Sequence, residues 1–203
     1  MMNETNVNTE TKKVNETKTE ILDFIKMVLI CFVLVFLCVK FFFRPITVSG
    51  SSMYPTLEDQ EFGFSNVFAG LTSEIERFDV VVVQDEKTGD DLWVKRVIGL
   101  PGEEIEYFDD QLYINGKPVE EPFLNKAYME TQIGDRNYGN TFTHDVEPIV
   151  LGEDEYFLLG DNRPVSRDSR AAGIGPFKRS SIISKNVLVL YPFDKIGMVS
   201  NDE

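Results

Sequence analysis

Cysteine and histidine, which most often build disulfide frameworks and metal centres, are scarce in this chain. The 203 residues include two cysteines, Cys31 and Cys38, and one histidine, His144. Both cysteines fall in a single strongly apolar stretch, and on a helix their spacing separates them by about 10 Å, too far for a disulfide. Residues 45–203 contain no cysteine. A disulfide-stapled fold or a cysteine-ligated zinc site is therefore excluded in that region.

Basic residues are also few, with 20 Lys and Arg against 34 Asp and Glu, for a formal net charge of −14. Residues 1–44 carry 6 basic and 5 acidic side chains, whereas residues 45–203 carry 14 basic and 29 acidic ones. Binding to nucleic acid rests on basic surface, so the sequence excludes DNA or RNA as the main partner. The 42% of hydrophobic residues is enough to bury a core.

Long apolar runs are absent except near the N-terminus. Residues 27–43 form a seventeen-residue run, MVLICFVLVFLCVKFFF, with one charge, at Lys40. Apolar residues before it extend the run to the length that a bilayer requires. Residues 21–44 therefore predict a transmembrane helix, behind a polar and repetitive tail at residues 1–20.

A cleavable secretory signal and a buried helix of a soluble core are the alternatives for the apolar run. No small-x-small cleavage site follows it, because Lys40, three Phe residues and Arg44 stand in that place. The segment is therefore expected to remain as an anchor. Four lysines precede the run, and this modest positive-inside bias predicts a cytoplasmic tail, with residues 45–203 on the other side of the membrane.

After Pro45 the pattern changes to short apolar runs separated by turn residues, which predicts a mainly β, antiparallel domain. A more polar, irregular segment at about residues 104–150 predicts a smaller lobe inserted into this β body. The expected strands are Ile46–Val48, Glu61–Val67, Asp79–Gln84, Leu92–Leu100, Ile105–Phe108, Gln111–Ile114, Glu155–Leu159 and Ile182–Tyr191.

Two adjacent basic residues, Lys95 and Arg96, interrupt the apolar strand LWVKRVIGL. A strand that is apolar on both faces is usually buried on both, and alternation then sends these two side chains to opposite faces. A buried Arg needs a carboxylate partner, whereas a buried Lys can lose its proton and act as a general base. The alternative is an edge strand whose two charges both reach solvent; the strand alone leaves these two interpretations open.

Two loops add hydroxyl and charged groups: residues 49–57, SGSSMYPTL, and residues 160–170, GDNRPVSRDSR. Each alone is typical of an ordinary solvated loop. The second loop offers Asp161 and Asp168 as partners for Arg96.

Taken together, SGSSMYPTL, VKRVIGLPGE and GDNRPVSRDSR, in this order behind one N-terminal anchor, resemble the conserved sequence boxes of type I signal peptidases, in their Gram-positive bacterial form. These are membrane-bound Ser/Lys endopeptidases that remove signal peptides from exported preproteins. The resemblance covers residues 21–195. It implies an acyl-enzyme mechanism without a metal or organic cofactor, and cleavage after an Ala-x-Ala-like motif.

Residue by residue, the resemblance implies that Ser52 is the nucleophile and Lys95 the general base. Catalytic support would come from Ser166, which would hold the Lys95 amine, and from two ion pairs. These are Asp161 with Arg96 and Asp168 with Arg170. The residues that would line shallow substrate pockets are Val48, Met53, Leu57, Trp93 and Val94.

One departure concerns the oxyanion hole. Some relatives, notably Gram-negative ones, have a Ser two positions before the nucleophile, where this chain has Gly50. The backbone N–H of Ser52 is the expected donor, and Ser51 or the Gly50 N–H are candidates for the second.

Three other interpretations are weaker. A soluble self-cleaving Ser/Lys protein of the repressor type would lack the anchor, and an inactive relative that serves as a surface binding partner would lack the Ser or the Lys. A triad built on His144 and Asp145 is disfavoured because sequence neighbours point apart. A calcium site is also disfavoured, because the five acidic residues at 103–110 lack the spacing of a calcium loop.

The side chains of Phe62, Phe64, Phe68 and Leu71 form either an apolar rim at the membrane or one face of a core strand.

Overall fold

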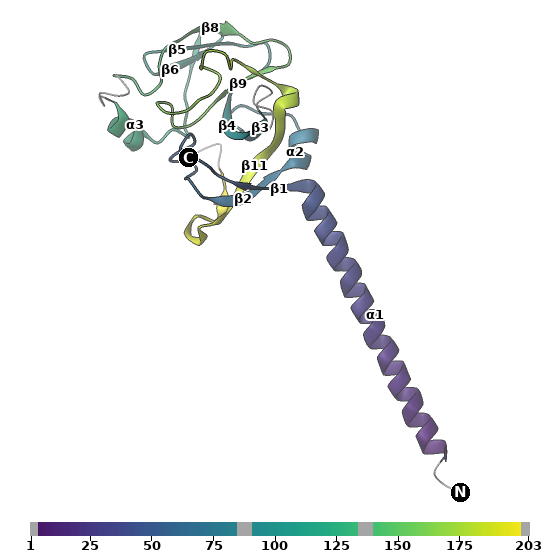
Figure 1. Cartoon of the computed structure of the whole chain (residues 1–203). Helices are drawn as coiled ribbons and strands as arrows, with labels where there is room; N and C mark the ends of the chain where they lie inside the picture. The colour runs from purple at the N-terminus through teal and green to yellow at the C-terminus, as the bar shows by residue number, and fades with distance from the viewer. Residues whose placement is uncertain (1–3, 85–90, 134–139, 200–203) are drawn as a thin grey trace. The chain divides into compact units, whose positions relative to one another are not determined.

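The computed structural model describes residues 4–84, 91–133 and 140–199, which divide between two units, residues 1–41 and 42–203. The first unit consists of helix α1, Glu4–Phe42 (Figure 1). Its 23-residue segment Glu20–Phe42 is long and apolar enough to cross a membrane, and none of the most apolar part is buried. The predicted tail is thus helical from Glu4, because an established helix propagates into neighbouring polar residues at low cost.

The second unit is mainly β, and every strand pairing in the described residues is antiparallel, so the predicted fold class is confirmed. The larger sheet has the order β1-β2-β11-β3-β4-β9-β10, with β12 added to β11. Its strands are β1 (Phe43–Thr47), β2 (Phe62–Asn66), β3 (Val80–Gln84), β4 (Leu92–Gly99), β9 (Glu155–Leu159), β10 (Phe177–Lys178), β11 (Ile182–Tyr191) and β12 (Gly197–Met198).

The smaller sheet has the order β7-β6-β5-β8 and fills the segment between β4 and β9, where the sequence predicts an inserted lobe. Its strands are β5 (Glu104–Phe108), β6 (Gln111–Ile114), β7 (Lys117–Val119) and β8 (Val146–Val150). The remaining elements are the short helices α2 (Val67–Thr72) and α3 (Lys126–Gln132) and the 3-10 turns η1 (Arg179–Ser181) and η2 (Phe193–Lys195).

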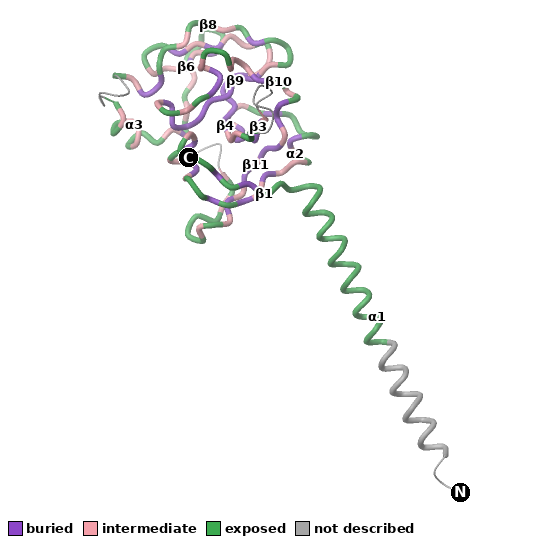
Figure 2. Tube along the Cα trace, viewed as in Figure 1, coloured by how far each residue is buried: buried purple, intermediate pink, exposed green. Residues whose placement is uncertain are grey.

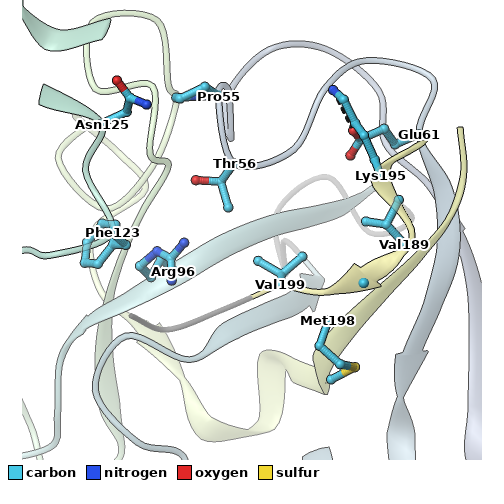
Figure 3. A pocket seen from close by; sticks show the side chains of 11 residues that line it. Pro55, Thr56, Glu61, Arg96, Phe123, Asn125, Val189, Lys195, Met198 and Val199 are labelled. Atoms are coloured by element: carbon cyan, nitrogen blue, oxygen red, sulfur yellow. Dashed lines mark ion pairs between the residues drawn. The ribbon is translucent and has the colours of Figure 1, made fainter. Parts of the chain in front are cut away.

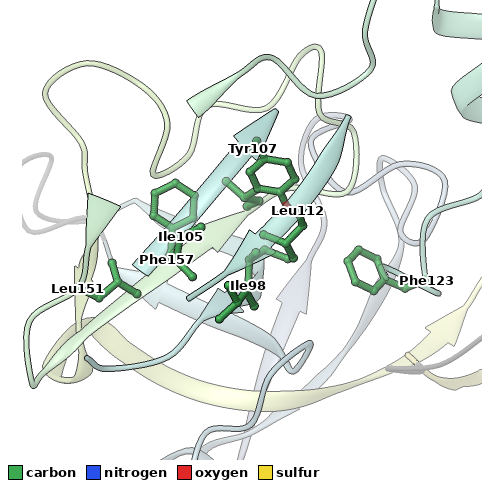
Figure 4. Packing of buried hydrophobic residues seen from close by; sticks show 9 residues of the cluster. Ile98, Ile105, Tyr107, Leu112, Phe123, Leu151 and Phe157 are labelled. Carbon is green, nitrogen blue, oxygen red and sulfur yellow. The ribbon is translucent and has the colours of Figure 1, made fainter. Parts of the chain in front are cut away.

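One of the three buried apolar clusters of the described residues joins the two sheets. Ile98 from β4 and Phe157 from β9 pack in one cluster with Ile105 and Leu112 of the smaller sheet (Figure 4). All four side chains are at most 1% exposed. The inserted lobe is therefore fixed to the larger sheet by apolar burial, which gives its side chains defined positions next to β4 and β9.

Strand β4 lies inside the larger sheet, between β3 and β9. Buried residues gather in the second unit, whereas residues 20–42 of α1 are exposed throughout (Figure 2). Lys95 stands opposite Val81 of β3, and Arg96 pairs with both Val80 of β3 and Leu159 of β9. Residues 95–99 are all buried. The interpretation of this segment as an edge strand is wrong, and the alternative of a strand buried on both faces is confirmed.

The chain leaves α1 two residues before the predicted end of the anchor. Phe43 and Arg44 already belong to β1, where they pair with Asn66 and Ser65 of β2. Pro45 is tolerated in this strand because β1 is the edge of its sheet, where a missing N–H costs little.

Candidate active site

Ser52 lies in a turn between β1 and β2. A hydrogen bond fixes the residues before Ser52, and apolar burial fixes the residues after it. Before it, Gly50 adopts a φ of +84° and donates its N–H to Asp59 Oδ1 at 2.8 Å. After it, Met53 and Leu57 are 1% and 0% exposed and pack in the core cluster beneath β1 and β11. These two apolar side chains fix the backbone that follows Ser52, while the serine itself is only partly buried.

The side chain of Lys95 reaches Ser52 from β4. Its Nζ lies 2.9 Å from Ser52 Oγ, and the residue is 3% exposed. Burial lowers the pKa of Lys95 from 10.5 to about 8, although the carboxylates of Asp168 and Asp161 act in the opposite direction. A substantial fraction of this amine is therefore neutral at mildly alkaline pH, which is the form that can accept a proton.

Arg96 forms a buried ion pair with Asp161, the first acid of the loop that follows β9. Their side chains are 0% and 1% exposed, with Nη2 and Nε of Arg96 at 2.7 and 2.9 Å from the two carboxylate oxygens. Thr56 Oγ1 donates to Asp161 Oδ2 at 2.6 Å, and the ring of Phe123 lies 4.0 Å from the guanidinium. The pair thereby ties β4, this loop and the turn of Ser52 together.

A second ion pair braces the same loop. Arg170 donates from Nε and Nη2 to Asp168 at 2.9 and 2.8 Å, and the Gly160 N–H donates to Asp168 Oδ2 at 3.1 Å. Burial raises the pKa of Asp168, but hydrogen bonding to Arg170 and its charge outweigh this and bring the pKa below its ordinary value. The carboxylate thus stays ionised and keeps the loop closed onto the end of β9.

Ser166, expected to hold the Lys95 amine, has a different environment. Its Oγ is buried and has no hydrogen-bond partner of good geometry within the described residues. It lies against Gly160 and near the Asp168 carboxylate, whose pKa it helps to lower. Within residues 4–84, 91–133 and 140–199, the Lys95 amine donates to Ser52 Oγ and not to Ser166.

A small cavity of about 100 Å³ opens beside Ser52 and Lys95. Of the five residues expected to line substrate pockets, Val48, Met53, Trp93 and Val94 do so here. Leu57 is absent from the lining because its side chain is fully buried in the core. The cavity has room for a few carbon atoms only.

The oxyanion candidates are not equivalent in this geometry. The Gly50 N–H is already engaged by Asp59, so it is a poor second donor. Ser51, the other candidate for the second donor, is exposed. The Ser52 N–H, the expected first donor, belongs to the peptide group between Ser51 and Ser52.

Sequence reasoning missed the residues that connect the loop 160–170 to the inserted lobe. Arg163 and Glu121 form an ion pair at 2.5 Å with side chains 0% and 6% exposed, and Arg163 also donates to Tyr107 Oη and Thr143 Oγ1. Asn162 contacts both Ser51 and Ser52. The sequence of this polar loop does not predict that Asn162 and Arg163 are buried, because the residues that pair with them lie far away in the sequence.

A larger pocket of about 270 Å³ shares no lining residue with the cavity at Ser52 (Figure 3). Arg96 and Thr56 line one part of it, and the ion pair of Glu61 with Lys195 lines another. It therefore adjoins the buried ion pair of the site but not the Ser52 hydroxyl.

The remaining sequence candidates do not line the cavity at Ser52 and Lys95, although His144 lines a separate pocket with Ser166 and Arg170. His144 is exposed, and its neighbour Asp145 accepts a hydrogen bond from the Asp109 N–H. No group of acidic, His or Cys residues suited to a metal ion occurs within residues 4–84, 91–133 and 140–199. Of the proposed apolar rim, Phe62, Phe68 and Leu71 are exposed and Phe64 is partly buried.

Comparison with known proteins identifies the family. Residues 21–191 match the family described as signal peptidase, peptidase S26. Signal peptidase I P of Bacillus subtilis subsp. natto is 41% identical over 184 residues, which cover 91% of this chain and 96% of that protein. Signal peptidase IB of Staphylococcus aureus (strain COL) is 38% identical over 191 residues, covering 92% and 97%.

A crystal structure of a signal peptidase I from Enterococcus faecalis is 34% identical and covers 56% of this chain and 97% of that one, with a TM-score of 0.48. The family match extends over most of the chain, and both sequence relatives come from Gram-positive bacteria. The chain therefore belongs to the signal peptidases of peptidase family S26, as a type I enzyme of the Gram-positive form.

Proposed function

We propose that this chain is a membrane-bound serine endopeptidase that removes signal peptides from exported preproteins, with Ser52 as nucleophile and Lys95 as general base. The observation that carries the proposal is the 2.9 Å distance between Ser52 Oγ and the buried Lys95 Nζ. A nucleophile within hydrogen-bond reach of a base whose pKa lies near the working pH is the arrangement that activates a hydroxyl.

In the acylation step, neutral Lys95 Nζ takes the Oγ proton of Ser52, and Oγ attacks the carbonyl carbon before the scissile bond. The C–N bond then breaks, and the Lys95 ammonium returns the proton to the leaving nitrogen, which becomes the amino terminus of the mature protein. Water, with Lys95 again as base, attacks the resulting ester. The signal peptide leaves with a free carboxylate, and Ser52 is regenerated.

The cavity beside Ser52 supports a preference for small side chains next to the cleaved bond. A cavity of about 100 Å³ lined by Val48, Met53, Trp93 and Val94 has the size and apolar lining to accept a small side chain such as alanine. This size restriction fits cleavage after a small-x-small motif.

Two ion pairs would keep this geometry rigid. The pair of Arg96 with Asp161 joins the strand of Lys95 to the turn of Ser52 through Thr56. The pair of Asp168 with Arg170 holds the loop that packs against Gly160. In this proposal Ser166 supports the site by packing against Gly160 near the Ser52 carbonyl, because none of its hydrogen bonds within the described residues reaches the Lys95 amine.

The helix segment Glu20–Phe42 supports membrane anchoring, with the tail in the cytoplasm and residues 45–203 on the outer side. Substrates that emerge through the bilayer would then meet the catalytic unit at the membrane where they are exported.

Substitution of the nucleophile tests the proposal. Ser52→Ala should abolish cleavage of a preprotein without lowering the melting temperature, because the hydroxyl forms the acyl bond and contributes little packing. Ser51→Ala, the adjacent hydroxyl, is the matched control and should retain most activity. The new amino terminus of the product is sequenced in each case. Equal loss in both variants would show that the nucleophile is misassigned.

A further inference from the structure

The peptide group between Ser51 and Ser52 is held by a side chain from another part of the chain. Asn162 Nδ2 donates to the Ser51 carbonyl at 2.9 Å, and the Asn162 backbone N–H donates to the Ser52 carbonyl at 3.0 Å. Asn162 is 4% exposed. It therefore fixes the peptide groups on both sides of the Ser52 Cα.

The first of these bonds controls the direction of a catalytic donor. The Ser51 carbonyl and the Ser52 N–H belong to one planar trans peptide group, so they point in opposite directions along the same plane. A bond that fixes the carbonyl also fixes the N–H. The Ser52 N–H is the donor that is expected to stabilise the oxyanion when Ser52 acts as the nucleophile.

The amide of Asn162 is itself oriented by the inserted lobe. Tyr128, in α3, donates its hydroxyl to Asn162 Oδ1 at 3.0 Å. Because an amide carries its acceptor and its donors on opposite arms, a donor at Oδ1 turns Nδ2 toward the Ser51 carbonyl. The ring of Tyr128 packs edge-on against Tyr54, two residues after Ser52, with centroids 5.0 Å apart.

The position of Tyr128 is well defined by its surroundings. Its backbone N–H donates to the helix-capping Asn125 Oδ1 at 2.9 Å, and its ring also contacts Phe142, with centroids 6.0 Å apart. Phe142 is 1% exposed and belongs to the same inserted segment. The phenol is thus presented to Asn162 by a packed part of the lobe.

We propose that Tyr128 and Asn162 form a positioning relay that aims the Ser52 N–H at the oxyanion, so that the inserted lobe contributes to transition-state stabilisation. This inference rests on the proposed function, because it assigns a role at the same serine. Neither residue touches the reacting atoms; Asn162 acts through the peptide group of the nucleophile, and Tyr128 acts through Asn162.

The experiment compares Tyr128→Phe, Asn162→Ala and the double variant in the full-length protein, with a preprotein as substrate. Tyr128→Phe removes one hydroxyl and keeps the ring contacts, and Tyr113→Phe in β6 is the matched control. We expect kcat to fall about tenfold for Tyr128→Phe and about a hundredfold for Asn162→Ala, because a misdirected oxyanion donor weakens transition-state binding only. KM, the melting temperature and the midpoint of the pH–rate profile should stay unchanged for Tyr128→Phe.

The double variant separates a relay from two independent effects. In a relay the phenol acts only through the amide, so the double variant should have the same kcat as Asn162→Ala. Multiplied losses, or a Tyr128→Phe enzyme with wild-type kcat, would overturn the inference. If Ser52→Ala still cleaved the preprotein, the proposed function itself would fail. An inactive Ser52→Ala together with a fully active Tyr128→Phe would refute the relay alone.

Discussion

Lys95 and Arg96 are consecutive on β4, yet burial has different consequences for them. The Lys95 amine can lose its proton, so desolvation lowers its pKa to about 8 and prepares a base. Arg96 keeps its charge at any accessible pH, so its burial requires a fixed carboxylate. Asp161 is this carboxylate, and both of its oxygens accept hydrogen bonds from Arg96. One residue of the pair is therefore suited to proton transfer and the other to holding the site together.

Arg96→Ala should lower the free energy of unfolding by about 3–5 kcal/mol, because it leaves Asp161 as an unpaired charge in the interior. Arg77→Ala is the control: Arg77 pairs with Glu103 with side chains 23% and 18% exposed, so solvent compensates part of its loss. Denaturant unfolding of both variants in detergent measures the difference. Equal, small losses would show that the Arg96 pair has no such energetic role.

The pairing of Ser52 with Lys95 and the two ion pairs of the loop 160–170 could be predicted from the sequence, whereas the contacts of that loop with the inserted lobe could not. Ser52 and Lys95 stand in recognisable motifs, and the apolar run around Lys95 already indicates burial. Asn162 and Tyr128 are 34 positions apart, and no local pattern predicts that a tyrosine in a polar segment meets that amide. The same holds for Arg163 and Glu121, separated by 42 positions.

The loop that starts at Gly160, directly after β9, lies close against the turn of Ser52. A Cβ at position 160 would collide with the Ser52 carbonyl and with Ser166 Oγ. The carbonyl is backbone and cannot rotate away. The end of β9 therefore requires glycine in order to approach the nucleophile closely.

Gly160→Ala is expected to displace the Ser52 backbone and lower kcat about a hundredfold, since small displacements of catalytic groups are costly. Gly152→Ala is the matched control: Gly152 lies three residues before β9, in a tight turn closed by the hydrogen bond from the Glu155 N–H to the Gly152 carbonyl. There an added Cβ would meet only the flexible Glu155 side chain, at 3.1 Å. Steady-state kinetics on one preprotein compare the two. A Gly160→Ala enzyme as active as Gly152→Ala would contradict the close approach.

The sequence predicts the strands that are rich in β-branched residues. It does not predict the shortest strands or the proline-containing strand β8. β3 and β4 follow directly from their valine-rich runs. β8 contains Pro148 and is exposed at most positions, so its sequence resembles a loop. An edge strand tolerates both features, and β8 is at the edge of the smaller sheet. Helices α2 and α3 have six and seven residues, which are too few to show a repeating helical pattern of apolar residues in the sequence. Both helices begin with an asparagine cap.

For the whole molecule, charge and apolar surface are divided along the chain. The apolar segment of α1 is exposed throughout, whereas the whole acidic excess lies in residues 45–203. A helix of this length and hydropathy is suited to a bilayer. The acidic surface of residues 45–203 is suited to water.

Protease accessibility tests the proposed topology. In protoplasts of cells that produce the full chain, trypsin added outside should digest residues 45–203 and leave an epitope tag at the N-terminus intact. Lysed protoplasts, in which both sides are accessible, serve as the control. Protection of the catalytic unit until lysis would reverse the proposed orientation.

The pH dependence of preprotein cleavage by the full-length enzyme tests the central claim most directly. Protonated Lys95 cannot take the Ser52 proton, so kcat/KM should rise about tenfold per pH unit below the lysine pKa and level off above it. With that pKa at about 8, most of the rise falls between pH 6 and 8. A rate that stays constant from pH 6 to 9 would contradict a neutral lysine as the base.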